Sequence, residues 1–318
     1  MQVVYDTVST RDAFGEALYK LALKDDNIFC IGPDTTKNMG MGRIEKEMPE
    51  RCYNVGICEQ NAALMAAGLA SCGAKAFVAT YSTFASMRML EQVRTFCAYT
   101  NLDVKVIAGM SGLAGGAEGV THQGSEDMSL MRSIANMVVV SPADAASARV
   151  ITRAITNYRG PVYLRLGKNS VPKVFDESYT FEIGKANWLH DGGKDASIVF
   201  TGAVASRAMQ AYETLCAQGI SVDLIEMPCV KPIDEESLLR AAKKTGAIVT
   251  VEDNNIIGGL GSAVAEVLSE QYPTLIKRIG VPDCFAESGD EAELLDKYGV
   301  TADAVVQAVR TLMEKKKA

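Results

Sequence analysis

Long apolar runs and a strong excess of positive charge are both absent from this 318-residue sequence. No run reaches the roughly 18 apolar residues that a membrane-spanning helix needs, and the start, MQVVYDTVSTRDAFGEAL, lacks the basic-then-apolar order of a secretion signal. The formal net charge of −7 provides no basic surface for nucleic acid or an anionic membrane. We therefore expect a cytoplasmic protein that binds neither nucleic acid nor membrane.

Histidine is scarce, and the cysteines are not arranged in pairs. With only His122 and His190 available, a histidine-based metal centre is not expected in this chain. The eight cysteines form no CxxC pair and lie in apolar strings such as SCGAKAFV. This pattern favours reduced, buried thiols over disulfides or a zinc site.

The sequence instead contains alternating strand and helix patterns. With 48% hydrophobic and 22% charged residues, it can bury a full core and divide into about two domains. Helical patterns occupy 9–23 and 59–72, and five apolar runs read as buried strands: NIFCIG, AKAFVATY, VKVIAGM, ANMVVVS and GPVYLRL. Parallel strands joined by crossover helices are the expected arrangement, which predicts an α/β fold.

A more polar stretch over about 175–195 separates this first region from a second one. SIVFTG, SVDLIEM and AIVTVED follow it as strand-like runs, with helical patterns over 203–218 and 235–244. We interpret the polar stretch as a linker and predict two α/β domains.

Glu59 occupies the point where an apolar strand end runs into a helix, within YNVGICEQNAALMAAGLASCG. Open α/β sheets bind ligands at such strand ends, so this carboxylate is a candidate functional group. A first-turn glutamate that only stabilises the helix dipole is the alternative.

Aromatic residues end the next strand pattern, FVATYSTFASMRMLEQVR. Tyr81 and Phe84 could offer a stacking face to a flat ring, or could belong to the core. Arg88 lies on the helical pattern that follows, where a helix-surface role would explain it as well.

A glycine-dense segment, GLAGGAEGVTHQGSEDMSLMRS, holds Glu118 and His122. Its four glycines between 112 and 119 would let backbone approach a ligand, and an imidazole there could bond substrate or move protons. A flexible surface loop with an incidental histidine is the alternative reading.

Two cations, Arg165 and Lys168, follow the strand in GPVYLRLGKN and would suit a phosphate, although a solvated basic edge would look the same. Further on, TVEDNNIIGGLGSAVAEVL places glycines between a strand and a helix. Its GGLG spacing is not G-x-G-x-x-G, so dinucleotide binding is not predicted.

Together, the order of the motifs resembles the C-terminal half of transketolases. The resemblance is carried by DTTKN with GR, then VGICEQN, TYSTF, EGVTHQ, PVYLRLGK, TGAVASRA and VEDNNIIGGLG. It implies a parallel-sheet, thiamine-diphosphate pyrimidine-binding domain over 1–176 and a smaller transketolase-type C-terminal α/β domain over 177–318. Similar halves occur in 1-deoxyxylulose-5-phosphate synthases and in beta subunits of 2-oxo-acid dehydrogenases.

The resemblance also implies roles for residues that match the family motifs. Glu59 matches the glutamate that hydrogen-bonds the aminopyrimidine and promotes its imino tautomer, and Phe84 matches the ring that stacks on it, with Tyr81 beside it. His122 matches a histidine that contacts substrate hydroxyls and helps proton transfer. Arg88 is a further candidate for cofactor binding.

Substrate-binding positions follow from the same comparison of motifs. Arg165 and Lys168 lie where the family meets the sugar phosphate, and either residue could do so. Glu118 stands where many transketolases have an aspartate, and Met110 stands where they have a histidine. These two departures predict an unusual sugar phosphate, such as a branched or deoxy ketose.

The implied activity is a transketolase reaction, in which a two-carbon ketol unit moves from a ketose phosphate to an aldose phosphate in pentose phosphate metabolism. The GDG…N magnesium motif of the pyrophosphate domain is missing, so a separate N-terminal subunit is expected to hold Mg²⁺ and the diphosphate. The resemblance implies a heterotetramer, with self-association through this chain. A subunit of a decarboxylating synthase or 2-oxo-acid dehydrogenase, and a non-catalytic assembly subunit, are the alternatives.

Overall fold

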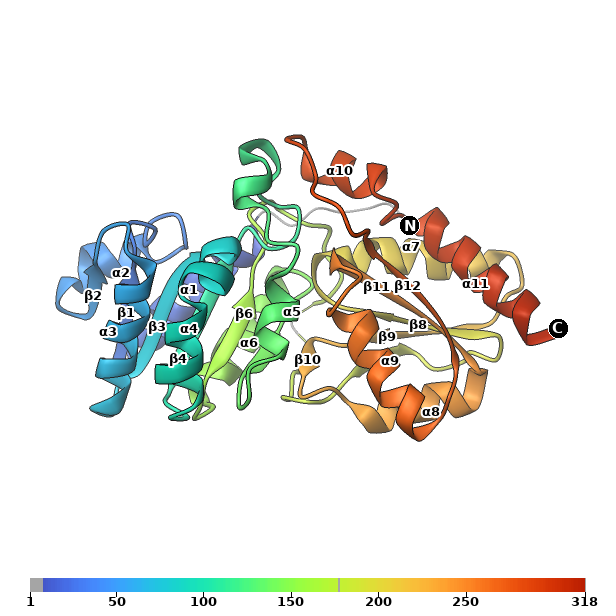
Figure 1. Ribbon diagram of the computed structural model, residues 1–318, viewed down its shortest axis with the longest axis horizontal. Coiled ribbons are helices and arrows are strands. Elements are labelled where there is room, and N and C mark those ends of the chain that lie inside the picture. Colours follow the sequence, from blue (N-terminus) through green and yellow to red (C-terminus); the bar gives the residue numbers. More distant parts are fainter. Residues whose placement is uncertain (1–7, 177, 318) are drawn as a thin grey trace.

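Two α/β lobes lie side by side along the long axis of the molecule (Figure 1). This computed structural model describes residues 8–176 and 178–317. Each lobe has a mostly parallel sheet with helices on both faces, as the alternation of strand and helix patterns predicted. No helix among these residues is long and apolar enough to cross a membrane.

The first sheet has seven strands in the order β10-β5-β6-β4-β3-β1-β2. Their bounds are β1 Ile28–Gly32, β2 Cys52–Asn54, β3 Lys75–Tyr81, β4 Val104–Gly109, β5 Val138–Val140, β6 Val162–Arg165 and β10 Cys229–Lys231. All neighbours pair in parallel except β10, which runs antiparallel to β5. The carboxyl ends of β3, β4 and β6 therefore meet at one edge, where ligands bind in such sheets.

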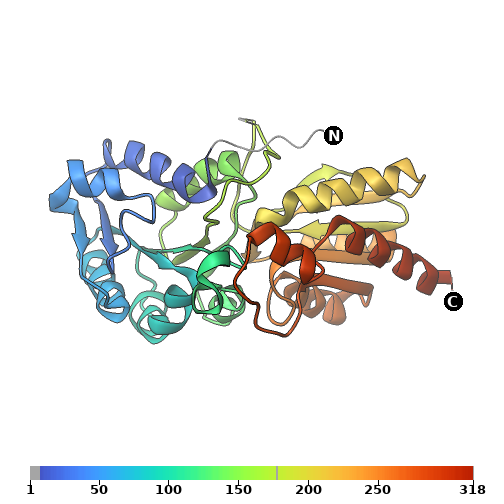
Figure 2. The ribbon, with the colours of Figure 1, turned by 90° about the horizontal axis from the view of Figure 1, so that it is seen from above.

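Helices cover both faces of this sheet (Figure 2). On one face lie α1 (Thr10–Ala22) and α6 (Ala145–Asn157), whose starts are capped by the side chains of Ser9 and Asp144. On the other face lie α3 (Glu59–Ser71), α5 (Asp127–Arg132) and a helical run made of a π-helix Phe84–Arg88, α4 (Leu90–Gln92) and a second π-helix Val93–Ala98. Five buried alanines let α3 pack closely on the sheet: Ala62, Ala63, Ala66, Ala67 and Ala70. A short helix, α2 (Gly42–Glu47), follows β1.

The second sheet has the order β12-β11-β8-β9-β7, with only β7 antiparallel. Its strands are β7 Asn187–His190, β8 Ala196–Phe200, β9 Val222–Glu226, β11 Ala247–Asn255 and β12 Leu275–Val281. One face is covered by α7 (Ala205–Ala217) and α11 (Ala302–Lys317), the other by α8 (Glu235–Thr245) and α9 (Leu260–Gln271). Between β12 and α11 lies α10 (Glu291–Lys297).

The two lobes share part of their core. One apolar cluster runs from α3 and β4 through Met227 and Val230 to α8 and α9. One segment after the predicted domain boundary at 176/177 still belongs to the sheet of the first domain, because β10 pairs with β5. The predicted linker contains one strand that the sequence did not reveal, β7.

The prediction of buried cysteines is only half right. Cys30, Cys52, Cys97 and Cys229 are buried, whereas Cys58, Cys72, Cys216 and Cys284 are exposed. All eight lie within the described residues, and none forms a disulfide.

Candidate active site

Glu59 is the first residue of α3 and sits just beyond the carboxyl end of the short strand β2. The side chain is buried despite its charge. Its Oε1 accepts a hydrogen bond of 2.8 Å from Arg88 Nη1. A buried carboxylate needs such a partner, because an unpaired charge away from water is costly.

Three rings from two separate segments pack together, and one of them, Phe84, lies under the guanidinium that bonds Glu59. Tyr81 ends β3, Phe84 begins the π-helix, and His122 comes from the glycine-rich loop, residues 112–126. The ring centroid of His122 lies 5.2 Å from that of Phe84 and 5.7 Å from that of Tyr81. The structure therefore brings together residues that are about 40 positions apart in sequence, as the predicted site requires. Single π-helical turns in helices are often found at functional sites.

The position of Arg88 shows what kind of group fits between the carboxylate of Glu59 and the ring of Phe84. Its guanidinium carbon lies 4.0 Å from the centroid of Phe84, while one of its nitrogens bonds Glu59. A planar group thus stacks on the phenyl face and donates to the carboxylate at the same time. An aminopyrimidine would make these same two kinds of contact, so the residues are suited to the pyrimidine end of thiamine diphosphate.

The glycine-rich loop also carries Glu118, whose carboxylate forms an ion pair with Lys168, a residue that lies just after β6. Lys168 Nζ donates to Glu118 Oε1 at 2.5 Å, and both side chains remain about one third exposed. This hydrogen bond to Lys168 is the main reason that the pKa of Glu118 is lowered. An ammonium beside a carboxylate can bind a sugar hydroxyl and an anionic group together.

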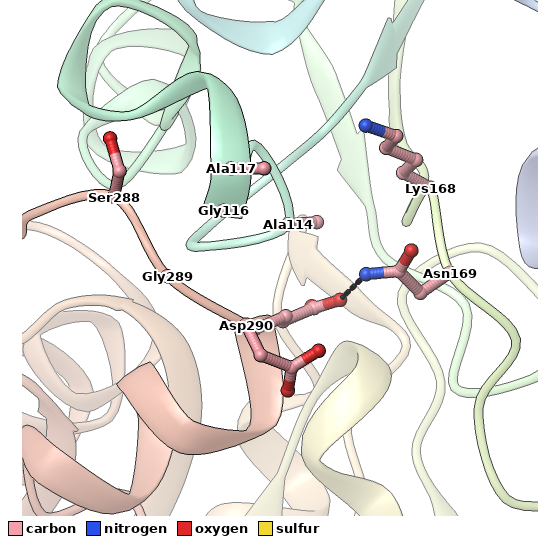
Figure 3. A pocket seen from close by; sticks show the side chains of 9 residues that line it. Ala114, Gly116, Ala117, Lys168, Asn169, Ser288, Gly289 and Asp290 are labelled. Atoms are coloured by element: carbon pink, nitrogen blue, oxygen red, sulfur yellow. Dashed lines mark hydrogen bonds between the residues drawn. The ribbon is translucent and has the colours of Figure 1, made fainter.

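A pocket of about 550 Å³ opens beside Lys168 (Figure 3). One wall is the glycine-rich loop, and the opposite wall comes from the C-terminal domain. The lining residues are Ala114, Gly116, Ala117, Lys168, Asn169, Ser288, Gly289, Asp290 and Glu291. Within it, Asn169 Nδ2 donates to Glu291 Oε2 at 2.8 Å.

Arg165 does not reach this pocket. Its side chain is 1% exposed and bonds the carboxylates of Asp127 and Asp253 at 2.7–3.0 Å. Burial alone would lower the pKa of Arg165, but the two carboxylates outweigh it and raise that pKa. The predicted phosphate-binding role does not suit this position, because the cation is enclosed and already neutralised; only Lys168 remains as the phosphate candidate.

Sequence reasoning missed the contribution of the C-terminal domain to the pocket. The segment FAESGDEAE, which contributes Ser288 to Glu291, has neither a periodic pattern nor a ligand-binding signature. Its place beside Lys168 depends on how the lobes pack, and no local signal in the sequence would have found it. Among the described residues, no group of three or more His, Cys, Asp or Glu side chains is arranged to hold a metal ion.

Comparison with known families identifies this architecture. Residues 6–173 match the family described as "Transketolase, pyrimidine binding domain", and residues 184–305 match "Transketolase, C-terminal domain". The chain belongs to the transketolase family. Both lobes of the structure are thereby assigned to transketolase domains, and the family resemblance of the sequence motifs is confirmed.

Several relatives in the transketolase family are themselves short chains. The chain is 40% identical, over 96% of its length and 95% of the relative, to "6-deoxy-6-sulfo-D-fructose transketolase subunit SqwH" of Clostridium sp. (strain MSTE9). It is 35% identical, over 97% of its length and 98% of the relative, to an apulose-4-phosphate transketolase subunit of Phocaeicola vulgatus. A solved structure described as "Split gene transketolase, inactive beta4 tetramer" is 41% identical, with a TM-score of 0.89 over 97% of this chain and 99% of that one.

Proposed function

We propose that this chain is the C-terminal subunit of a two-subunit, thiamine-diphosphate-dependent transketolase. The observation that carries the proposal is the buried Glu59, which a planar cation links to Phe84, itself packed with Tyr81 and His122. Family membership and the subunit names of its relatives support it.

In this proposal, Glu59 holds the ring nitrogen of the aminopyrimidine and shares a proton with it. Phe84 stacks on the ring, and Tyr81 borders it. Thiamine diphosphate, when bound, supplies the nucleophilic carbon and the electron sink for breaking the carbon–carbon bond of a ketose. His122 bonds the substrate hydroxyl and moves its proton, a role that suits an imidazole on a loop facing the cofactor site.

The substrate is a ketose with an anionic group at the end remote from the reacting carbons. Lys168 meets that group, and Glu118 accepts a hydrogen bond from a neighbouring hydroxyl. The relatives are named for sugars with a sulfo or a phosphate group, which supports an anionic end without deciding which sugar is used.

A separate N-terminal subunit completes the site in this proposal. It holds Mg²⁺ and the diphosphate, and the relatives named as transketolase subunits support such a division of the site. The assembly is a heterotetramer in which copies of this chain also contact one another. The name of the related split-gene structure, a beta4 tetramer, supports self-association of such subunits.

The experiment is to compare Glu59→Gln with the unaltered chain after reconstitution with the N-terminal subunit, thiamine diphosphate and Mg²⁺. Because glutamine cannot share the proton, we expect kcat for ketol transfer to fall about a hundredfold or more. Glu314→Gln, a change to an exposed carboxylate on α11 in the C-terminal domain, is the control and should keep full activity. Full activity of Glu59→Gln would instead point to a non-catalytic assembly subunit.

A further inference from the structure

The glycine-rich loop is packed along its length against the C-terminal domain. Of its four glycines between 112 and 119, three face that domain at distances that leave no space for a side chain. A Cβ at Gly112 would lie 2.6 Å from the backbone oxygen of Asp253, one at Gly116 would lie 2.5 Å from that of Gly289, and one at Gly119 would lie 2.5 Å from Ser288 Oγ. Glycine density here is therefore explained by contact between the domains.

Hydrogen bonds from the C-terminal domain also hold the loop, at Gly116, Gln123 and Ser125. Gly289 N donates to Gly116 O at 3.2 Å, and Asn255 N donates to Ser125 O at 2.7 Å. The side chain of Gln123, next to His122, donates to the backbone oxygen of Glu287 at 3.0 Å. The loop that carries Glu118 and His122 thus has its backbone fixed by residues of the other domain.

A buried cluster of charged side chains connects both ends of the loop to the C-terminal domain. Arg165 Nε donates to both oxygens of Asp127, just beyond the loop, at 3.0 Å. Its Nη1 donates to Oδ1 of Asp253, at 2.7 Å, and Asp253 also abuts Gly112 at the loop's start. Gly112 has a φ of +61°, a conformation that a glycine adopts without strain. One carboxylate of the C-terminal domain therefore reaches both loop ends.

From these contacts we infer that the C-terminal domain positions the substrate-binding loop, with Asp253 as the positioning residue that acts through Arg165 and Gly112. This inference rests on the proposed function, because that function assigns Glu118 and His122 to the substrate. Asp253 itself touches neither cofactor nor substrate. Its carboxylate fixes where the loop starts and ends, and thereby where the imidazole of His122 lies. The wall of the pocket in Figure 3 is set by the same contact.

The chain offers a direct readout, because it contains only two histidines. His122 lies on the loop, and His190 lies far from it, stacked on Tyr212 with a centroid distance of 4.1 Å. We would record the imidazole resonances of the full chain, without partner or cofactor, and assign them with His122→Gln. In Asp253→Asn, the signals of His122 should shift or broaden while those of His190 stay in place.

The matched control is Asp223→Asn in the same domain. Asp223 is also fully buried and accepts bonds from Gly193 N, Ser197 Oγ and Lys244 Nζ, none of them on the loop. This change should lower the melting temperature comparably, yet leave the signals of His122 in place. Equal movement of those signals in both variants would mean general loosening and would overturn the inference.

A second variant covers the case that Asp253→Asn does not fold, since it leaves Arg165 with one partner fewer. The triple change Asp127→Asn, Arg165→Met and Asp253→Asn removes all three charges together, which is tolerated far better than breaking a buried pair. It should fold and still shift the signals of His122. Unchanged His122 signals in a folded variant would contradict the positioning role.

Kinetics of the reconstituted enzyme give the second readout. Asp253→Asn should raise KM for the ketose about three- to thirtyfold, while the affinity for thiamine diphosphate stays unchanged. A purely structural role would lower the active fraction and leave KM the same. If the unaltered enzyme transfers no ketol unit, the proposed function fails, but the resonance experiment still decides the inference about the loop.

Discussion

Arg88 occupies, in the chain on its own, the space between Glu59 and the face of Phe84 that the proposal assigns to the aminopyrimidine. The cofactor ring and this guanidinium cannot lie there together. Arg88 must therefore swing outward on binding, and its half-exposed side chain has solvent to move into. The buried carboxylate of Glu59 keeps a hydrogen-bond partner throughout, because the aminopyrimidine would take the place of the Arg88 guanidinium.

Replacing Arg88 with methionine should therefore tighten cofactor binding. Arg88→Met keeps the apolar stem and removes the competing charge, so the Kd for thiamine diphosphate in the assembled enzyme should fall about two- to fivefold. Titration calorimetry measures this directly, with Arg153→Met, at an exposed arginine of α6 on the other face of the sheet, as control. Weaker binding of Arg88→Met would show instead that the guanidinium contacts the bound cofactor.

Lys168 is the cation that remains available for the anionic end of the substrate. Lys168→Met should raise KM for the ketose about tenfold and change kcat little, because a partly exposed charged hydrogen bond is lost in substrate and transition state alike. Initial rates of the reconstituted enzyme test this, with Lys194→Met, at an exposed lysine, as control. An unchanged KM would remove Lys168 from the site.

The sequence was informative about single residues only where local context decides their place. Glu59 at a helix start and Tyr81 at a strand end could be placed from the sequence, because the helix and strand that carry them show clear periodic patterns. Arg165 could not be interpreted correctly, since its two carboxylate partners come from segments 38 and 88 positions away. Whether a strand-end arginine meets substrate or a buried acid is decided by packing between the lobes.

Among the elements, many with long apolar or periodic patterns were predicted, but the seven-residue strand β12 and the sixteen-residue helix α11 were not. The helix predicted over 9–23 is Thr10–Ala22, and the one predicted over 59–72 is Glu59–Ser71. The strands β2, β7 and β10 are three or four residues long and contain no apolar run that would predict a strand. The two π-helical turns lie in the segment Phe84–Ala98, which contacts α3, and no local pattern in the sequence indicated them.

The glycine-rich loop shows how a correct local observation received an incomplete explanation. Its glycines were expected to let backbone approach a ligand. In the structure, three of them instead allow the C-terminal domain to pack closely against the loop. A sequence alone shows that a side chain is missing, but it does not show which neighbour requires the space.

Two strands of the C-terminal domain carry buried acids that make stability depend on pH. Burial raises the pKa of Glu226, at the end of β9, from its usual 4.5 to about 8, despite hydrogen bonds from Asn187 and Tyr179. Burial likewise raises the pKa of Glu252, on β11, to about 7. The folded state therefore holds protons that the unfolded state has released in this range.

The free energy of unfolding should accordingly fall as the pH rises from about 5 to about 8. The raised pKa stabilises the folded state fully below the unfolded value, and this contribution is lost as pH passes the folded value. Glu226→Gln should flatten much of this dependence in urea unfolding curves, whereas Glu293→Gln, on the exposed side of α10, should not. Stability that rises over this pH range would contradict the assignment.

At the scale of the whole molecule, apolar side chains are exposed beside the candidate site. Leu64 lies on α3, and Met87, Phe96 and Tyr99 lie on or next to the helical run that packs against it. Ile57, two residues before Glu59, is exposed as well. Apolar groups gathered at one face are typical of a surface that another polypeptide covers, which supports a two-chain site.

The central claim is that this chain supplies the pyrimidine half of a two-chain transketolase site, and ketol transfer by reconstituted chains tests it most directly. The N-terminal subunit would be titrated into this chain with thiamine diphosphate and Mg²⁺, while transfer from xylulose 5-phosphate to ribose 5-phosphate and from other anionic ketoses is followed. We predict turnover that rises to a plateau at equal amounts of the two chains, with none from either chain alone. No ketol transfer from any ketose, together with carbon dioxide release from pyruvate, would contradict the claim and point to a decarboxylating synthase.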